Sequence, residues 1–154
     1  MPVPAPVTLH ASCLALGEVG ILVRGPSGSG KTTLVRDLLA RGTISRTFAA
    51  LVGDDRVVLT LRHGRVVARP HPALAGLIEI RGCGPQPLEP AIASVLVRLV
   101  VDLAETAARL ADPEEETVLL LGAAVPRMIL PRDPSRVETV LWRWRRLHAM
   151  MTVG

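Results

Sequence analysis

Lysine is almost absent from this sequence. Lysine and arginine together number 18, yet Lys31 is the only lysine among the 154 residues. The two side chains are not interchangeable, because lysine carries a compact charge whereas the guanidinium of arginine is planar. A single lysine in an arginine-rich chain therefore indicates a position where a compact positive charge is needed.

Aromatic residues, cysteines and long apolar runs are also scarce. With one Phe, two Trp and no Tyr, the core must consist mainly of aliphatic side chains. Cys13 and Cys83 lie far apart and form no metal or redox motif, so we expect reduced core thiols and a cytoplasmic protein. Arg98 and Asp102 interrupt the best candidate for a membrane span of about 18 residues, so we expect no membrane contact. The N-terminus also lacks the basic start of a secretory signal.

The length and charge fit a small phosphate-handling domain. We expect one domain over residues 1–154, with a loose, proline-containing lead-in over residues 1–6. A net charge of +4 is compatible with a nucleic-acid binder, a phosphate-handling enzyme or an acidic protein partner. No basic run has interleaved aromatic residues, so we expect no nucleic acid as a partner.

The lysine lies in a glycine-rich motif, Gly25-Pro-Ser-Gly-Ser-Gly-Lys-Thr32, which matches the phosphate-loop pattern G-x-x-x-x-G-K-[ST]. The apolar run over residues 19–23 predicts a strand before the motif. The pattern over residues 33–40 predicts a helix after it. A glycine-rich turn that binds nothing is disfavoured, because the motif and its context agree.

Each position of this loop has a physical role. We expect Gly25, Gly28 and Gly30 to adopt positive φ and to turn backbone N–H groups toward a phosphate at the helix N-terminus. Lys31 is expected to contact the β- and γ-phosphates, and Thr32 is expected to offer its hydroxyl to Mg²⁺. The predicted nucleotide-binding residues are Gly25, Pro26, Ser27, Gly28, Ser29, Gly30, Lys31, Thr32 and Thr33.

Two adjacent acids, Asp54 and Asp55, follow a predicted strand over residues 48–52. In phosphate-loop proteins an acid at a strand end lies beside the loop. There it can hold Mg²⁺ or its waters, or accept a proton from an attacking hydroxyl. A turn that uses Asp for local hydrogen bonds is the structural alternative. The phosphate-loop motif favours the functional interpretation.

The segment over residues 77–81 contains one acidic and one basic residue. Glu79 and Arg81 alternate with Ile78 and Ile80, so we expect the two charged side chains on one face of a strand. An acid suits a metal ion and an arginine suits a transferring phosphoryl group. A solvated ion pair explains the same pattern equally well when the segment is considered alone.

Strands outnumber helices in the predicted chain, so it is not a plain doubly wound nucleotide-binding domain. One helix is predicted over residues 31–41 with Gly42 as its C-cap, and a second begins after the N-cap Ser135. A hairpin is expected across residues 62–65, and Pro126 and Pro131 are expected to bound the strand over residues 127–130. An irregular connection is expected over residues 85–90, and a helix is the alternative for residues 94–103. The predicted strands cover residues 7–16, 19–23, 48–52, 57–61, 66–68, 77–81, 94–103, 117–121 and 127–130. The apolar residues of the second helix are Val137, Val140, Leu141, Trp144, Leu147 and Met151.

Taken together, these motifs resemble the catalytic domain of the bacterial HPr serine kinase/phosphorylase, in the short form that lacks an N-terminal domain. The Asp-Asp-Arg-Val and Glu-Ile-Arg-Gly-x-Gly segments are more specific than the phosphate-loop. The matching pieces run in order through nearly the whole chain: Leu9-His10, Gly25–Thr32, Leu51–Val57, Ile78–Gly84, Arg109-Leu110 and Val125–Pro131.

The resemblance implies an α/β fold. Its core is a strand-rich phosphate-loop unit similar to phosphoenolpyruvate carboxykinase, with a C-terminal helix, and the family commonly assembles as a hexamer. It implies an enzyme that uses ATP and Mg²⁺ to phosphorylate a serine of HPr, the phosphocarrier protein of the phosphotransferase system. It also implies a reverse reaction in which inorganic phosphate removes that phosphoryl group to give pyrophosphate.

The resemblance also assigns roles to residues. Asp55 would accept the proton of the serine hydroxyl, and Asp54 would share this role or orient the site. Lys31 would bind phosphates and stabilise the transferred charge. The remaining assignments are Thr32 and Glu79 to Mg²⁺, His10 and Arg109 to further active-site positions, and Arg127, Arg132 and Arg136 to a stretch used in dephosphorylation and partner contact. Without the resemblance, His10 would be a structural histidine and these arginines would be surface charge.

Three other functions remain open from the residues alone. A small-molecule kinase on the same core would phosphorylate a metabolite and ignore HPr. A non-catalytic ATP sensor would keep its activity when Asp55 is replaced by Asn. A nucleic-acid binder would show steep salt dependence, but the carboxylates of Asp54, Asp55 and Glu79 at one site would repel a phosphate backbone.

Overall fold

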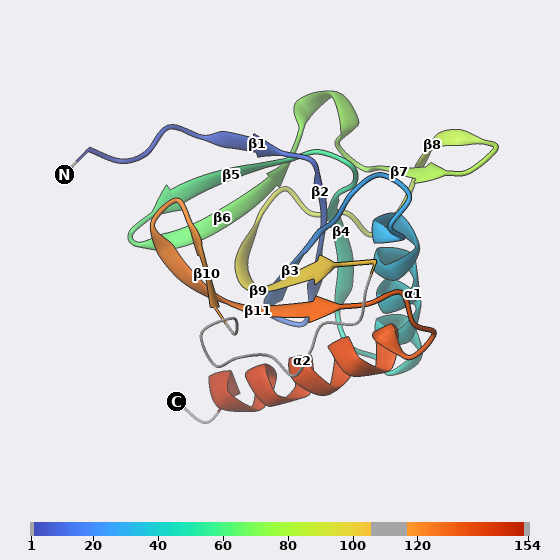
Figure 1. Ribbon diagram of the computed structural model, residues 1–154. Coiled ribbons are helices and arrows are strands. Elements are labelled where there is room, and N and C mark those ends of the chain that lie inside the picture. Colours follow the sequence, from blue (N-terminus) through green and yellow to red (C-terminus); the bar gives the residue numbers. More distant parts are fainter. Residues whose placement is uncertain (1, 106–116, 153–154) are drawn as a thin grey trace.

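The computed structural model describes residues 2–105 and 117–152 and has a strand-rich α/β fold that ends in a helix (Figure 1). This confirms the predicted fold class in its broad form. The strands are β1 (Val7–Leu9), β2 (Ala11–Leu16), β3 (Val19–Arg24), β4 (Ala49–Gly53), β5 (Val57–Arg62), β6 (Arg65–Pro70), β7 (Leu77–Ile80), β8 (Gly84–Pro87), β9 (Val95–Leu103), β10 (Thr117–Leu120) and β11 (Ala123–Leu130). The helices are α1 (Lys31–Ile44) and α2 (Arg136–Thr152), with a short 3₁₀ turn, η1 (Pro72–Leu74).

One mixed sheet contains most of the strands in the described residues. Its order is β1-β5-β6-β9-β3-β2-β4, and the β10–β11 hairpin joins it where β11 pairs with β9. Strands β3 and β9 run parallel, with Arg24 opposite Asp102. The loop that follows β3 and the segment that follows β9 therefore leave the sheet at the same end of these two parallel strands. Strands β7 and β8 form a separate two-stranded sheet.

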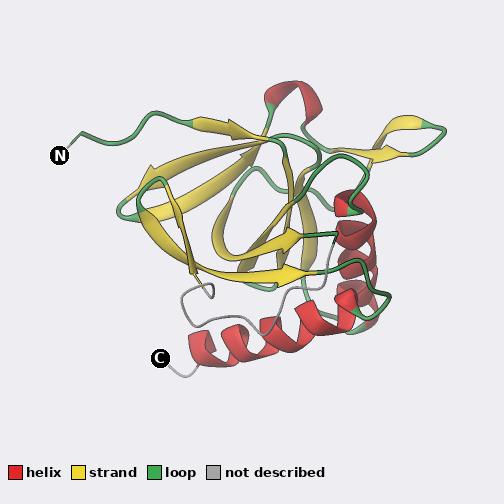
Figure 2. Ribbon diagram, viewed as in Figure 1, coloured by secondary structure: helices red, strands yellow, loops and turns green. Residues whose placement is uncertain are grey.

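The central strands are buried on both faces because two apolar cores flank them. In the first core, Leu34 and Leu38 of α1 and Trp144 of α2 pack against β3 residues such as Ile21. The second core lies among the strands and includes Leu22 of the same strand. Figure 2 shows the two helices next to each other on one side of the strands. Every residue of β2 is buried, so this strand shows no alternation of buried and exposed positions.

The single strand predicted over residues 7–16 is in fact two strands. Strand β1 pairs with β5, whereas β2 pairs with β3 and β4. The chain bends at His10 between them. The backbone N–H of Ala11 donates to the carbonyl of Asp55 at 3.1 Å, outside the regular ladder. The bend leaves the His10 side chain partly exposed rather than within the sheet.

The predicted end of the first helix is also wrong. Helix α1 continues to Ile44 and has Ser45 as its C-cap. Gly42 lies inside the helix and is buried, because a Cβ there would approach the Cβ of Ala49 to 2.6 Å and Leu16 Cδ1 to 2.8 Å. The glycine therefore allows the helix to pack closely on β2 and β4, and it does not terminate the helix.

The strand predicted over residues 94–103 is confirmed as β9, which begins at Val95, and the helical alternative is wrong. The predicted hairpin over residues 62–65 is confirmed too, since β5 and β6 pair antiparallel with Arg62 opposite Arg65. Its two turn residues, His63 and Gly64, have φ values of 51° and 74°. The predicted apolar side chains of α2 all belong to the first core or pack against it.

Two proline-containing segments differ from the prediction. Residues expected to form an irregular connection contribute strand β8, in which Pro85 lies opposite Glu79. Pro126 was expected to bound a strand, yet it lies inside β11. It sits where β11 changes its partner from β10 to β9. Proline has no N–H to donate, so a position between two ladders accommodates it well.

The predicted N-cap of α2 is right in position but not in its hydrogen bond. The Ser135 carbonyl accepts from the N–H of Thr139 at 3.0 Å, as the carbonyl before a helix does. The Ser135 hydroxyl instead donates to Asp133 Oδ1 at 2.7 Å. Within the part of the chain that the structure describes, no helix is long and apolar enough to span a membrane.

The two cysteines have different environments. Both are free, and Cys13 is buried in the second core as predicted. Cys83 is exposed, so the prediction that it is a core thiol is wrong. It lies in the tight turn between β7 and β8, where its N–H donates to the carbonyl of Ile80 at 2.9 Å.

Candidate active site

The loop between β3 and α1 turns sharply at its glycines. Gly28 and Gly30 have φ values of 79° and 97°, in the left-handed region that favours glycine. Gly25 does not adopt positive φ, which corrects the prediction for this position. A Cβ at Gly25 would lie 2.6 Å from Ser29 Oγ and 3.1 Å from the Cβ of Leu103, so close packing explains this glycine.

The N-terminus of α1 opens toward this loop. Gly30 is the N-cap residue and provides no side-chain hydrogen bond to the first turn. The first N–H groups of a helix have no partner within the helix, and they carry partial positive charge. The loop and the helix end therefore form a surface suited to an anion.

The only lysine in the sequence, Lys31, follows this loop directly and is the first residue of α1. Lys31 is 7% exposed, and its Nζ donates to the carbonyls of Gly25 at 2.8 Å and Pro26 at 3.3 Å. Burial lowers the pKa of Lys31, while the charges of Asp55 and Asp54 oppose this effect. The Lys31 Nζ also lies 3.4 Å from His10 Nε2.

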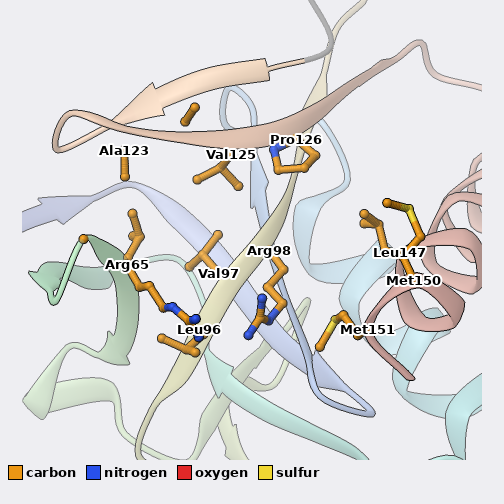
Figure 3. A pocket seen from close by; sticks show the side chains of 13 residues that line it. Arg65, Leu96, Val97, Arg98, Ala123, Val125, Pro126, Leu147, Met150 and Met151 are labelled. Carbon is orange, nitrogen blue, oxygen red and sulfur yellow. The ribbon is translucent and has the colours of Figure 1, made fainter. Parts of the chain in front are cut away.

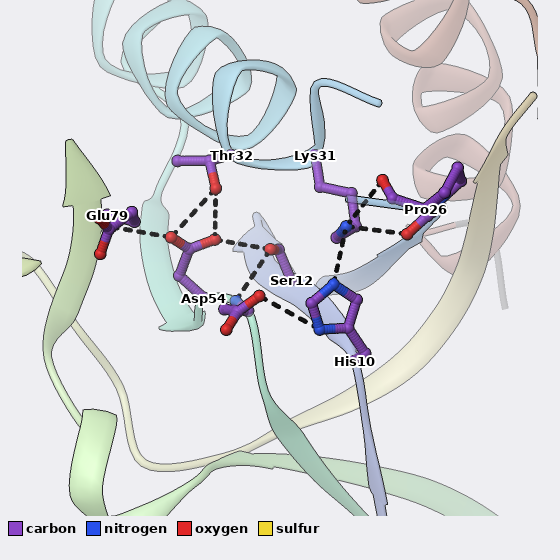
Figure 4. A network of polar contacts seen from close by, with 9 residues as sticks. His10, Ser12, Pro26, Lys31, Thr32, Asp54 and Glu79 are labelled. Carbon is purple, nitrogen blue, oxygen red and sulfur yellow. Dashed lines mark hydrogen bonds and ion pairs between the residues drawn. The ribbon is translucent and has the colours of Figure 1, made fainter. Parts of the chain in front are cut away.

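Asp54 is the centre of a buried hydrogen-bond network (Figure 4). The side chain is 3% exposed, and its carboxylate accepts the Ser12 hydroxyl at 2.6 Å and the Thr32 hydroxyl at 2.9 Å. It also accepts the backbone N–H of Glu79 at 2.8 Å. Asp54 thus ties β2, the first turn of α1 and β7 to the loop that follows β4.

Asp55 has a different environment from its neighbour. Its φ is 66°, and its side chain is 51% exposed. Its Oδ1 lies 3.2 Å from His10 Nδ1, and its N–H donates to Ser12 Oγ at 3.2 Å. The second nitrogen of His10 faces Lys31. The side chains of Asp55, His10 and Lys31 therefore form a continuous row beside the loop.

A cavity of about 600 Å³ opens in front of this row. Its volume is in the range of small-molecule sites. The residues that line it are His10, Ser27, Gly28, Gly30, Lys31, Thr32, Thr33, Arg36, Asp55, Glu79, Arg81, Gly82 and Arg132. Of the predicted site residues, Asp54 lies beneath the cavity and holds Thr32, while Gly25, Pro26 and Ser29 shape the loop. Arg109 lies outside the described residues.

A second cavity, of about 360 Å³, lies between β9, the β10–β11 hairpin and the C-terminal end of α2 (Figure 3). Most of its lining is apolar, including Val97, Leu147 and Met151, with two arginines, Arg65 and Arg98. No carboxylate and no residue of the glycine-rich loop lines it. The candidate active site is therefore the larger cavity at the loop.

Sequence reasoning did not foresee that the start of α2 contacts this loop. Arg132 donates to the carbonyl of Gly28 at 2.5 Å, and Arg136 donates to the carbonyls of Ser29 and Pro131, each at 3.0 Å. Burial and the neighbouring Arg132 charge lower the pKa of Arg136. The contacts with Gly28 and Ser29 join segments more than a hundred residues apart, so no local pattern could reveal them.

Arg127 does not share this position. Its Nη1 lies 3.5 Å from Asp102 Oδ2, and Asp102 also forms a bidentate ion pair with Arg24 at 2.7 and 2.8 Å. Ser12 is the other residue that sequence reasoning missed. A single hydroxyl in the apolar run of β2 was the available signal, since a buried hydroxyl needs a partner.

The oxygen groups beside the loop fit Mg²⁺ better than a softer metal. Among the residues that the structure describes, no group of three or more His, Cys, Asp or Glu side chains could hold a metal ion. The Thr32 hydroxyl lies against the Asp54 carboxylate, and Asp55 and Glu79 are the acidic residues that line the cavity. Mg²⁺ typically takes one or two protein oxygens and completes its coordination with substrate phosphates and water.

Comparisons of sequence and structure relate this chain to known proteins. The model of the HPr serine kinase C-terminal domain matches residues 4–143. A solved structure of the Hpr(Ser) kinase/phosphatase from Coxiella burnetii superposes with a TM-score of 0.74 and 27% identity, covering 96% of this chain and 93% of that one.

Three curated relatives of this chain are each named HPr kinase/phosphorylase. The relative from Chlorobium phaeobacteroides is 30% identical over 86% of this chain and 40% of its own length. The relative from Xanthomonas campestris is 30% identical over 96% of this chain and 50% of its own. A Mycoplasma mycoides relative is 39% identical over 49% of this chain and 22% of its own. The chain thus spans about half, or less, of the length of these curated relatives.

Proposed function

Because the chain belongs to the family of the HPr serine kinase C-terminal domain, we propose that it is an ATP-dependent kinase that phosphorylates a serine of HPr. One observation carries the proposal. The only lysine, the Thr32 hydroxyl, Asp55 and Glu79 line one cavity at the mouth of a glycine-rich loop. Phosphoryl transfer depends mainly on positioning and on charge stabilisation, and this set of groups can supply both.

The loop is proposed to bind the triphosphate of ATP. Backbone N–H groups at the start of α1 would face the phosphate oxygens. Lys31 would exchange the carbonyls of Gly25 and Pro26 for phosphate oxygens, because an ammonium interacts more strongly with a charged oxygen than with a neutral carbonyl. Arg132 and Arg136 would keep the loop in this shape through its carbonyls.

Thr32 and Glu79 are proposed to hold Mg²⁺, with Asp54 fixing the Thr32 hydroxyl. When bound, Mg²⁺ would neutralise charge that develops on the phosphate oxygens. Asp54 is buried and already accepts three hydrogen bonds, so its role is to orient the groups around it.

Asp55 is proposed to accept the proton of the attacking serine. It is half-exposed, it lines the cavity, and His10 contacts its carboxylate on one side. As the serine Oγ forms its bond to the γ-phosphorus, the bond from that phosphorus to the bridging oxygen breaks and ADP leaves. The serine proton passes to Asp55. A general base must lie within hydrogen-bond reach of the proton it abstracts, and the partly exposed carboxylate meets this requirement for a docked serine.

Incubation with labelled ATP, Mg²⁺ and HPr tests the proposal. We expect label on HPr and none on an HPr variant in which the target serine is alanine. Adding inorganic phosphate after the labelling step and measuring the pyrophosphate formed tests the reverse reaction that the resemblance implies. Binding of ATP without labelling of HPr would reject the proposal and leave two alternatives. Transfer to a metabolite would identify a small-molecule kinase, whereas no transfer at all would favour an ATP sensor.

Several finer properties stay predictions. Arg109 is proposed as a further active-site residue on the strength of the resemblance, and its replacement by alanine should reduce turnover more than ATP binding. The kinship of this phosphate-loop core with phosphoenolpyruvate carboxykinase, a hexameric assembly and a cytoplasmic location rest on the same resemblance or on composition. Light scattering of the purified chain would test the hexamer.

A further inference from the structure

Ser12 is a fully buried hydroxyl in a strand of otherwise apolar residues. Burying a hydroxyl costs free energy unless the group is hydrogen-bonded. The Ser12 hydroxyl forms two hydrogen bonds, one with each of the adjacent aspartates, Asp54 and Asp55. We propose that Ser12 is the positioning residue that holds these two aspartates in their different orientations, a role that rests on the proposed kinase function.

The direction of each bond follows from the chemistry of the hydroxyl. A serine hydroxyl has one proton to donate and two lone pairs to accept with. The proton goes to Asp54 Oδ1 at 2.6 Å, and a lone pair accepts the N–H of Asp55 at 3.2 Å. A single side chain therefore contacts the carboxylate of one aspartate and the backbone of the next.

Asp55 needs such support because of its backbone conformation. Its φ of 66° lies in the left-handed region, which costs a non-glycine residue free energy. Three consecutive residues hold it there. Ser12 accepts its N–H, Ala11 donates to its carbonyl at 3.1 Å, and His10 pairs with its carboxylate at 3.2 Å.

The bend between β1 and β2 makes this arrangement possible. His10 lies in the bend, and Ala11 and Ser12 open β2. Residues 10–12 therefore contact the side chain, the carbonyl and the N–H of Asp55. Without the Ser12 hydroxyl, the Asp55 N–H would lose its acceptor and the peptide between the two aspartates would be free to rotate.

The test compares three variants of the full chain. Ser12→Ala removes the hydroxyl, and Ser12→Thr retains it. Cys13→Ala is the matched control, since it also truncates a buried side chain of β2, but that side chain lies in the second core, on the face of the strand opposite Ser12. For each variant we would measure kcat and KM for HPr phosphorylation, ATP affinity, urea unfolding, and hydrogen exchange of the Asp55 amide.

We expect Ser12→Ala to lower kcat by about 10- to 100-fold, as misplaced catalytic groups do, with little change in ATP affinity. Exchange of the Asp55 amide should become faster, whereas Cys13→Ala should reduce stability and leave both kcat and this amide unchanged. Ser12→Thr should recover most of the lost turnover. If threonine is too large for the site to fold, Ser12→Cys, close in size but a weak hydrogen-bond donor, should fold and stay as impaired as Ser12→Ala.

Two results would overturn the role of Ser12. One is normal turnover in a folded Ser12→Ala variant. The other is a loss of turnover that tracks stability in the same way for Ser12→Ala and Cys13→Ala. Amide exchange needs no substrate, so it separates this proposal from the kinase proposal. If the unmodified chain fails to phosphorylate HPr, faster exchange of the Asp55 amide in Ser12→Ala would still support the positioning role, and unchanged exchange would refute it.

Discussion

The guanidinium of Arg136 donates to the backbone carbonyl of Ser29 at 3.0 Å, which ties the first turn of α2 to the glycine-rich loop. A second branch of the same guanidinium binds the carbonyl of Pro131. The C-terminal helix therefore supports the loop of the candidate active site, although no residue of α2 lines the cavity of about 600 Å³ at that loop.

Arg136→Ala should weaken both the fold and ATP binding. It removes the donor for two carbonyls, and a lost hydrogen bond to a charged group costs about 1–3 kcal/mol. Urea unfolding and ATP titration would measure the two effects. Arg145→Ala, at an exposed position of the same helix, is the control and should change neither. An Arg136→Ala variant with unchanged ATP affinity would show that the loop keeps its shape without this contact.

Lys31→Ala should reduce phosphoryl transfer by about 10²- to 10³-fold, the usual cost of losing a group that stabilises charge in the transition state. Lys31→Arg should restore little of the activity, because a planar guanidinium does not fit among the carbonyls of Gly25 and Pro26 and beside His10. Initial rates with labelled ATP would measure both variants. Normal turnover in either would remove Lys31 from its proposed role.

Asp55→Asn should bind ATP and fold normally but fail to transfer the phosphoryl group, since an amide cannot accept the serine proton. Asp54→Asn should instead destabilise the chain by about 1–3 kcal/mol, because its amide NH₂ would face donors from Ser12, Thr32 and Glu79. Urea unfolding and the labelling assay would separate the two substitutions. Equal effects of both on stability would contradict the assigned division of roles.

The two thiols should differ sharply in reactivity. Burial raises the pKa of the Cys13 thiol, so little of the nucleophilic thiolate forms near neutral pH. Cys83 is exposed. An alkylating reagent near pH 8 should therefore modify Cys83 alone in the folded chain and both thiols in urea. Mass spectrometry of the digested protein would locate the label, and rapid labelling of Cys13 in the folded chain would contradict its place in the core.

Local patterns predicted the parts of this site that depend on neighbouring residues. The spacing of glycines, Lys31 and Thr32 specified a strand, a tight loop and a helix, because such a loop is built within one short segment. The turn at His63 and Gly64 and the apolar face of α2 were predictable for the same reason. The pair of aspartates was correctly placed at a strand end, next to the loop.

Other features depended on contacts between distant segments. The sequence alone placed Gly42 at a helix end, whereas close packing on Leu16 and Ala49 keeps it inside α1. The residues alone did not divide the roles of the two aspartates, and only the resemblance favoured Asp55 as the proton acceptor.

By itself, then, the sequence determined a glycine-rich loop between a strand and a helix and which acids accompany it, since both follow from residue type and short spacing. Tertiary structure alone decided that Asp54 is buried while Asp55 faces the cavity, because Ser12 of β2 and His10 of the bend before it come from more than 40 residues away. It likewise decided that Arg136 holds the loop, because that contact forms only when α2 packs beside α1.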